Sequence, residues 1–297
     1  MERKAIRYSL SDRVFLGFVW VSLGMFLLII AYPLLYVISA SMSGGINTMR
    51  PSLIPVRFSL EGYRAVIRYK WIWVGYRNSL YYLALGTIIS LVVTVCCAYP
   101  LSRPDFAARR AVMSLCVFTM YFSGGLIPNY LLIKQMRLID NPLAVLLPCA
   151  LSVYNMLVMR TYFATQIPED LREAAQLDGC GDLRFLMRIV LPLSVPVLAV
   201  IGLYYAIFIW NSYFNAMIYL QTRGKFPLPI FLREILILNT ASDLTQSIDL
   251  DAMASMEARQ NVMKYAVIIV SCLPVMLLYP FVQRYFIKGI MIGAVKG

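Results

Sequence analysis

An all-α membrane protein with about six transmembrane helices is the fold class that the sequence predicts, on three observations. Of the 297 residues, 60% are hydrophobic and 14% are charged, whereas soluble domains average about 45–50% apolar and about 25% charged residues. The mean hydropathy is +0.71, which excludes an ordinary soluble domain and a disordered chain. Because one membrane-spanning helix needs about 20 apolar residues, the chain can hold six of them with short loops.

Six apolar runs are the expected helices in chain order. They occupy residues 14–42, 78–102, 111–134, 142–165, 189–220 and 262–286. The first run is about twice as long as the apolar core of a signal peptide, and basic residues precede it, so we expect an uncleaved helix. Gly124, Gly125 and Pro128 interrupt the third run.

The distribution of charge predicts an orientation in the membrane. Lys and Arg exceed Asp and Glu by 27 to 15, a net charge of +12, and basic residues in short segments beside spans favour the cytoplasm. Residues 1–13 and the turn 103–110 are such segments, which indicates a cytoplasmic N-terminus. Because six spans place both ends of the chain on the same side, the C-terminus is expected in the cytoplasm as well. The segment 43–77 holds six Lys and Arg residues and argues for the opposite orientation. Its Trp71 and Trp73 predict a stretch along the membrane surface.

The residue types that usually carry catalysis or bind metals are scarce. The chain has no His and six Cys, none of them in a CxxC pair, so we expect no catalytic residue, no metal site and no disulfide framework. No GxxxxGK[ST] phosphate-binding motif occurs, so no cofactor is expected in this chain. Nucleic acid is not an expected partner, because the polar loop 166–192 holds more acidic than basic residues and phosphate binding needs a basic face.

The loop 166–192 has the pattern of a helix, a turn and a second helix. Pro168 suits a helix start, and the acidic residues that follow it favour the positive end of the helix dipole. Gly179 and Gly181 permit the positive φ that stops a helix. Asp182 is predicted to cap a second helix that runs straight into the fifth apolar run.

Within this loop, a Glu-Ala-Ala triplet at 173–175 is followed by a glycine at 179, an isoleucine at 189 and Leu-Pro at 191–192. At this spacing the loop resembles the EAA loop of bacterial ABC importer permeases. The matching residues are Glu173, Ala174, Ala175, Asp178, Gly179, Ile189, Leu191 and Pro192. Segments 210–215 (WNSYFN) and 283–297 are similar to the maltose-type carbohydrate branch. Segments 124–128 (GGLIP) and 232–236 (LREIL) resemble the subgroup that handles oligosaccharides of complex polysaccharides.

The resemblance implies a fold, a location and a set of partners. Residues 14–297 would form the transmembrane domain of a type I ABC importer in a bacterial plasma (inner) membrane, with 166–192 as its cytoplasmic coupling loop. The partners would be a second, different permease, two ATPase subunits that bind ATP and Mg, an extracytoplasmic solute-binding protein and an oligosaccharide.

A docked helix can act as a lever because a rigid-body shift of the partner moves the spans attached to it. The small Ala174 and Ala175 would permit close approach to the ATPase, and Glu173 could pair with a basic residue on it. The alternative interpretation of 166–192 is an ordinary amphipathic loop between two spans.

A candidate substrate path lies on the fifth run, where Tyr204, Phe208, Asn211 and Asn215 recur on one helical face. Amides can hydrogen-bond sugar hydroxyls, and aromatic rings can stack on sugar faces. The alternative is contact between helices inside the bundle. Asn155 and Tyr121 are similar but isolated, and for them helix packing is favoured.

Two further hypotheses concern the substrate and the energy source. The basic segment 43–77 could attract an acidic saccharide such as a uronate oligomer, although contact with a partner or with lipid headgroups is the simpler interpretation. A secondary transporter or channel for a small polar solute is the alternative function. Such proteins place ionisable residues within their spans, and the six runs here are almost free of them.

Overall fold

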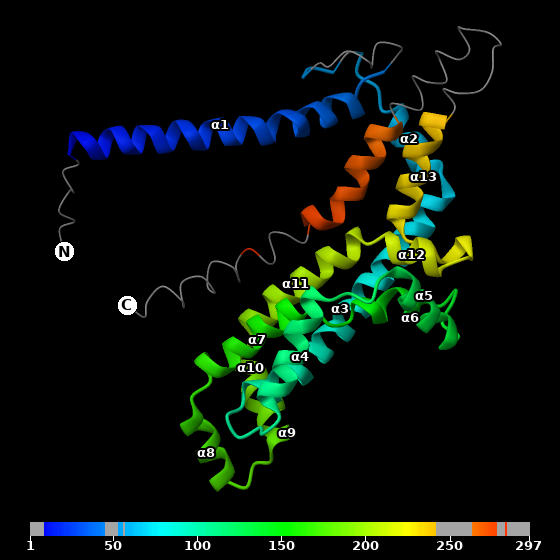
Figure 1. Cartoon of the computed structure of the whole chain (residues 1–297). Helices are drawn as coiled ribbons and strands as arrows, with labels where there is room; N and C mark the ends of the chain where they lie inside the picture. The colour runs from blue at the N-terminus through cyan, green and yellow to red at the C-terminus, as the bar shows by residue number, and fades with distance from the viewer. Residues whose placement is uncertain (1–8, 45–52, 56, 242–262, 278–282, 284–297) are drawn as a thin grey trace. The chain divides into compact units, whose positions relative to one another are not determined.

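The computed structural model describes residues 9–44, 53–55, 57–241, 263–277 and 283. Within these ranges the regular elements are helices, and a single antiparallel bridge joins Ser43 to Phe58 (Figure 1). The all-α prediction is therefore confirmed. The expected segments 1–13, 43–77, 221–261 and 283–297 lie partly outside the described residues, as does the end of the sixth apolar run.

Two compact units make up the chain. One comprises Met1–Tyr69 with Ile235–Ser271, and the other Lys70–Glu234 with Cys272–Gly297. The first unit contains α1 (Leu10–Ser41), which begins with a capping box: the Ser9 hydroxyl accepts from the Asp12 amide, and the Asp12 carboxylate accepts from the Ser9 amide. The apolar central stretch of α1 has none of its residues buried, so a bilayer is the surrounding that this helix requires.

The remaining helices of the first unit are short. α2 spans Glu61–Arg68, in the stretch that the sequence predicts to lie along the membrane surface, and this orientation stays a prediction. An apolar helix spans Met263–Leu277 within the expected sixth run. The Tyr36 and Tyr265 hydroxyls lie 3.2 Å apart and join α1 to this helix.

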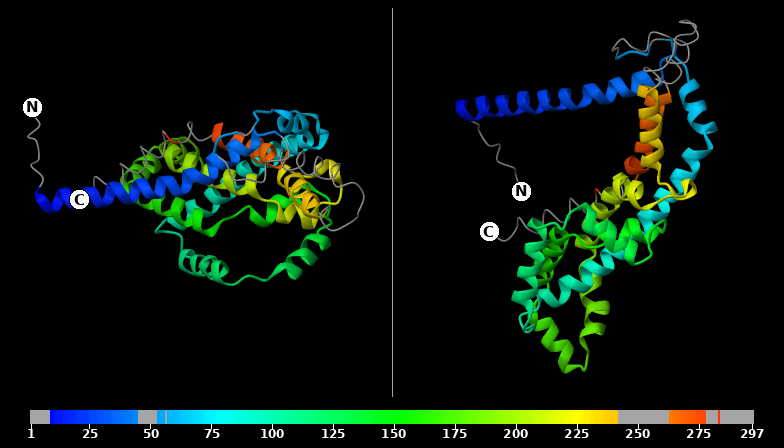
Figure 2. Two further views of the ribbon diagram at one scale, coloured as in Figure 1. Left: turned by 90° about the horizontal axis from the view of Figure 1, so that it is seen from above. Right: turned by 45° about the vertical axis from the view of Figure 1, so that its right-hand side comes forward.

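The core of the second unit is built on α3 (Lys70–Ser102), which packs along α7 (Val153–Gln166) and α11 (Val195–Asn211) (Figures 1 and 2). Apolar side chains of the three helices form one buried cluster that includes Ala98, Met156 and Ile201. The Tyr205 hydroxyl lies 2.7 Å from the Thr94 hydroxyl and accepts from the Ser152 amide at 3.0 Å. These bonds satisfy polar groups that would otherwise destabilise a buried helix contact.

Among the described residues, two unbroken helices, α1 and α3, are long and apolar enough to cross a membrane, and three bent pairs raise this number to as many as five. α4 (Arg109–Tyr121) and α5 (Leu126–Gln135) meet at 117°, where the sequence predicts the glycine interruption. α6 (Pro142–Leu146), with the turn that follows it, meets α7 at 55°. Asp182–Leu193 meets α11 at 82°.

The third bend corrects the prediction that the second loop helix runs straight into the fifth span. α9 (Asp182–Phe185) continues through a π-helical turn, Leu186–Val190, and α10 (Leu191–Leu193), and the chain turns at Ser194. Pro196 has no amide hydrogen for the carbonyl of Pro192, four residues earlier, so the helical ladder is interrupted there. The expected run 189–220 breaks a second time after α11, and α12 (Phe214–Tyr219) follows.

The segment after α12 forms α13 (Leu228–Ala241), where the sequence predicts no element. Gly75 of α3 makes this contact possible within the second unit. A Cβ on Gly75 would lie 2.9 Å from the Leu228 Cα and 2.8 Å from the Phe231 ring. Only a residue without a side chain therefore permits this close approach of the two helices.

Candidate functional site

The loop 166–192, the predicted coupling loop, forms the expected helix–turn–helix at one end of the second unit, opposite α12 (Figures 1 and 2). Its first helix, α8 (Glu169–Leu177), begins after Pro168 and carries Glu169 and Asp170 in its first turn. Acidic side chains there interact favourably with the helix dipole. The predicted start of this helix is confirmed.

The turn after α8 is a Schellman motif. Gly179 has φ +74°, its amide donates to the Gln176 carbonyl at 2.9 Å, and the Cys180 amide donates to the Ala175 carbonyl at 2.9 Å. These two bonds satisfy carbonyls that the end of a helix leaves open. The positive φ predicted for Gly179 is confirmed, whereas Gly181 has φ −72° and an extended conformation.

α8 presents a compact exposed surface. Glu173 and Ala174 are exposed, and Leu177 at the end of the helix is 90% exposed. Ala175 is 8% exposed and belongs to the apolar core of its own chain. The exposed side of α8 therefore includes Glu173, Ala174 and Leu177, whereas Ala175 packs α8 against its own chain.

The remaining residues of the predicted motif lie around the turn and in the second helix. Asp178 is the exposed C-cap residue of α8. Ile189 and Leu191 are half-buried against the core, and Pro192 is exposed in α10. The C-terminal part of the motif thus attaches the loop to the bundle, while its N-terminal part is exposed.

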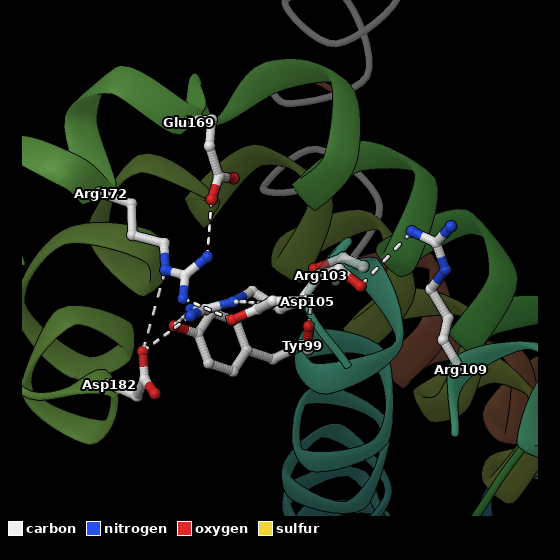
Figure 3. A network of polar contacts seen from close by, with 8 residues as sticks. Tyr99, Arg103, Asp105, Arg109, Glu169, Arg172 and Asp182 are labelled. Carbon is white, nitrogen blue, oxygen red and sulfur yellow. Dashed lines mark hydrogen bonds and ion pairs between the residues drawn. The ribbon is translucent and has the colours of Figure 1, made fainter. Parts of the chain in front are cut away.

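Five charged residues join the loop to the turn after α3, and we call them the interloop cluster: Arg103, Asp105, Glu169, Arg172 and Asp182 (Figure 3). The Arg172 guanidinium donates to Asp105 and to Glu169, both at 2.6 Å. Arg103 donates to Asp182 at 2.8 Å and to Asp105 at 3.3 Å. The Arg103 and Arg172 side chains are 10% and 13% exposed.

Electrostatics within the interloop cluster favour its charged form. Hydrogen bonds from Arg103 and from Arg172 hold the pKa of the Asp105 carboxyl below its ordinary value. The Arg103 guanidinium also lies 5.2 Å from the centre of the Tyr99 ring, in a cation–π contact. The predicted capping role of Asp182 is wrong, because Asp182 lies inside α9 and its carboxylate accepts from Arg103 instead.

Sequence reasoning missed the interloop cluster. From the sequence, the turn 103–110 indicates only an orientation, and nothing singles out Arg172. Asp105, two residues after Arg103, was the available signal, because opposite charges at the end of a membrane helix can form ion pairs with a neighbouring loop. Which loop forms those ion pairs depends on packing between distant segments.

The predicted substrate-path residues do not form one continuous face. Tyr204, Phe208 and Asn211 are exposed on α11, and the Asn211 amide donates to the Ile207 carbonyl at 2.8 Å. α11 ends at Asn211 because Ser212 is extended (ψ 114°). Asn215 therefore lies on α12, where its amide contacts the Cys149 sulfur at 3.2 Å.

The two isolated candidates differ in burial. Asn155 is buried at the start of α7, and Tyr121 is 87% exposed at the end of α4. Within the described residues, no group of three or more His, Cys, Asp or Glu side chains could hold a metal ion.

A bundle of bent, apolar helices with a charged helical loop at one end is consistent with a membrane transport subunit. No family model matches the chain. It is 38% identical, over 97% of its length and 100% of the relative's, to the polygalacturonan/rhamnogalacturonan transport system permease protein YtcP of Bacillus subtilis. It is 37% identical to protein LplC of the same organism, over 89% of both chains.

Similarity to a solved structure agrees with these relatives. The chain superposes with a TM-score of 0.84 and 35% identity on a bacterial ABC transporter involved in the import of the acidic polysaccharide alginate, covering 95% of this chain and 100% of that one. The chain belongs to the permease subunits of carbohydrate ABC importers. This membership favours ATP-driven import over the alternative of a secondary transporter or channel.

Proposed function

We propose that this permease imports acidic oligosaccharides, namely uronate oligomers released from a polysaccharide. The observation that carries the proposal is the agreement of two independent comparisons. The relative at 38% identity is named for polygalacturonan, and the solved structure at 35% identity is named for alginate. Both names denote polymers rich in uronic acids.

The energy for import comes from separate ATPase subunits that bind ATP and Mg, and α8 docks on one of them. The exposed Glu173, Ala174 and Leu177 support this role, since they leave one side of α8 open to a partner that can contact a charged, a small and an apolar side chain together. Glu173 pairs with a basic residue of the ATPase, and Leu177 enters an apolar groove.

Membership of the family supports the remaining components of the proposal. A second, different permease covers the exposed face of α11, and an extracytoplasmic binding protein delivers the sugar. Tyr204, Phe208 and Asn211 contact the sugar from α11, and Asn215 does so from α12. Asn155 supports the helix packing, and Tyr121 contacts either the partner permease or lipid. Residues 14–297 form one transmembrane domain with both termini in the cytoplasm of a bacterial plasma membrane.

Substrate class is tested by uptake in cells that carry the complete importer. Uptake of a labelled trigalacturonate is measured in competition with unlabelled uronate oligomers and with neutral oligosaccharides of equal length. We expect the uronate oligomers to compete at least tenfold more strongly. Equal competition by the neutral sugars would remove the acidic substrate from the proposal.

Docking and orientation are tested with one substitution, Leu177→Cys. Cys180 is half-buried, so position 177 is the better site for a thiol probe. We expect the new thiol to resist an impermeant reagent in intact cells and to cross-link to the ATPase in membranes. Labelling in intact cells would place the loop outside and contradict the docking.

A further inference from the structure

The helix α8 needs contacts with other parts of the chain to be stable. It has nine residues and buries one of them, Ala175, whereas isolated helices shorter than about 12–15 residues are marginal in water. A cavity of about 320 Å³ lies beside α8, lined by residues that include Phe163, Ile167 and Arg172. This pocket is partly open to the surroundings, so apolar packing against α8 is incomplete on that side.

The interloop cluster provides this support through one carboxylate. The two oxygens of Asp105 accept from different arginines, Oδ1 from Arg103 and Oδ2 from Arg172. Arg103 also reaches Asp182, the first residue of α9. The turn after α3, the coupling helix and the start of the second loop helix therefore meet within one set of ion pairs (Figure 3).

The inner end of α3 is also tied to the bundle. Arg160 of α7 donates to the Leu101 carbonyl at 3.0 Å, and Arg109 donates to the Arg103 carbonyl at 3.4 Å. Cations at the C-terminal end of a helix satisfy its open carbonyls and interact favourably with its dipole. A displacement of the turn after α3 is thus a displacement of α3, which packs along both α7 and α11.

We infer that Arg103 and Arg172 are positioning residues that pass the movement of the docked α8 into α3. The coupling loop then has two connections to the bundle: a covalent one through α9 and α10 into α11, and an electrostatic one through Asp105 into α3. Moving α3 and α11 together shifts two packed helices as one body. This inference rests on the proposed docking of α8 to an ATPase.

The test measures ATP hydrolysis and oligosaccharide import together, with this chain co-expressed with its partner subunits and the complex reconstituted in liposomes. Arg172→Gln and Asp105→Asn each remove one side of the central ion pair, and the double variant removes both. We expect the ratio of import to ATP hydrolysis to fall about tenfold in each single variant. The double variant should fall about as far as either single variant, since residues that act through one contact are not additive.

Two further variants keep the test decisive. Arg172→Lys retains the charge without the planar fork and should retain at least a third of the wild-type ratio. Arg110→Gln changes an exposed arginine in the first turn of α4, outside the cluster, and should leave the ratio unchanged. If Arg172→Gln prevents assembly of the complex, Asp105→Asn and Arg172→Lys decide the result.

The inference is overturned if the single variants keep the wild-type ratio, or if the losses in the double variant multiply to about a hundredfold. The docking itself is judged separately by the Leu177→Cys cross-link. A cross-link with an unchanged ratio in the cluster variants would remove the role of Arg103 and Arg172 alone. Absence of the cross-link would remove the docking on which that role depends.

Discussion

The two ends of the second unit both contain ion pairs and side-chain bonds to backbone carbonyls, but in different proportions. At the end opposite the coupling loop, side chains bind the backbone of residues 224–228. The Asn78 amide donates to the Gly224 and Phe226 carbonyls at 2.8 and 3.0 Å, and the Tyr82 hydroxyl donates to the Lys225 carbonyl at 2.7 Å. At the coupling end, the bonds of the interloop cluster join charged side chains to each other.

We call the end where side chains bind the backbone of residues 224–228 the brace, and the end that holds the interloop cluster the joint. Side-chain bonds to backbone carbonyls fix the path of the loop itself, and the loop cannot move without leaving those carbonyls open. Ion pairs between side chains of separate elements can lengthen and form again while each element keeps its backbone bonds. Under the proposed docking of α8, the end with the interloop cluster moves as a unit and the other end keeps its shape.

The largest effect should come from Gly179→Pro, which breaks the turn of the coupling loop. Proline has φ near −65° and cannot adopt the +74° observed at this position. We expect import to fall more than tenfold, with the chain still present in the membrane, measured by uptake and by immunoblotting of membranes. Gly181→Ala is the matched control, since Gly181 has φ −72° and open space around a Cβ. Wild-type uptake in Gly179→Pro would contradict the lever.

Next in size is the exposed contact surface of α8. Leu177→Ala should weaken ATPase binding by about 2 kcal/mol, roughly 30-fold in Kd, as is typical of a central apolar contact. Glu173→Lys should uncouple ATP hydrolysis from import by reversing the charge of the proposed pair. Leu183→Ala, an exposed leucine on α9, serves as the control. Binding is measured by titrating the ATPase onto the purified permease pair, and equal losses at 177 and 183 would argue against a specific surface.

At the brace, Asn78→Ala should destabilise the fold without uncoupling transport. It leaves two backbone carbonyls without their donor, which costs about 1–3 kcal/mol. Thermal unfolding in detergent should show this loss. Asn211→Ala is the control for stability, since within the described residues the exposed Asn211 amide bonds only to a carbonyl of its own helix and its loss should change stability by less than about 0.5 kcal/mol. A ratio of import to ATP hydrolysis that falls as far as in the interloop variants would contradict the distinction between brace and joint.

The smallest effect concerns pH. Asp140 accepts hydrogen bonds from Lys225 and from Thr222, and these lower its pKa far below the ordinary value. A carboxyl with a depressed folded pKa contributes stability above its unfolded pKa of about 3.9 and loses it as the pH falls towards the folded pKa. Asp140→Asn should therefore reduce the loss of thermal stability between about pH 5 and pH 3. An unchanged slope would show that Asp140 carries no such linkage.

Much of this molecule could be predicted from local sequence. Apolar runs define helices because the bilayer rejects unpaired backbone groups. The glycine at 179 could be predicted because a helix end needs a left-handed residue. The motif spacing indicated the transporter class, which the relatives confirm.

What the tertiary structure decided involves residues far apart in the chain. The bend at Ser194, the burial of Ala175 rather than Ala174, and the meeting of Asp105 with Arg172 depend on how helices pack. The contact between Asp105 and Arg172 joins residues 67 positions apart. Local periodicity places each of these side chains on a helix or a turn, but the partner it meets depends on the free energy of the whole packed bundle.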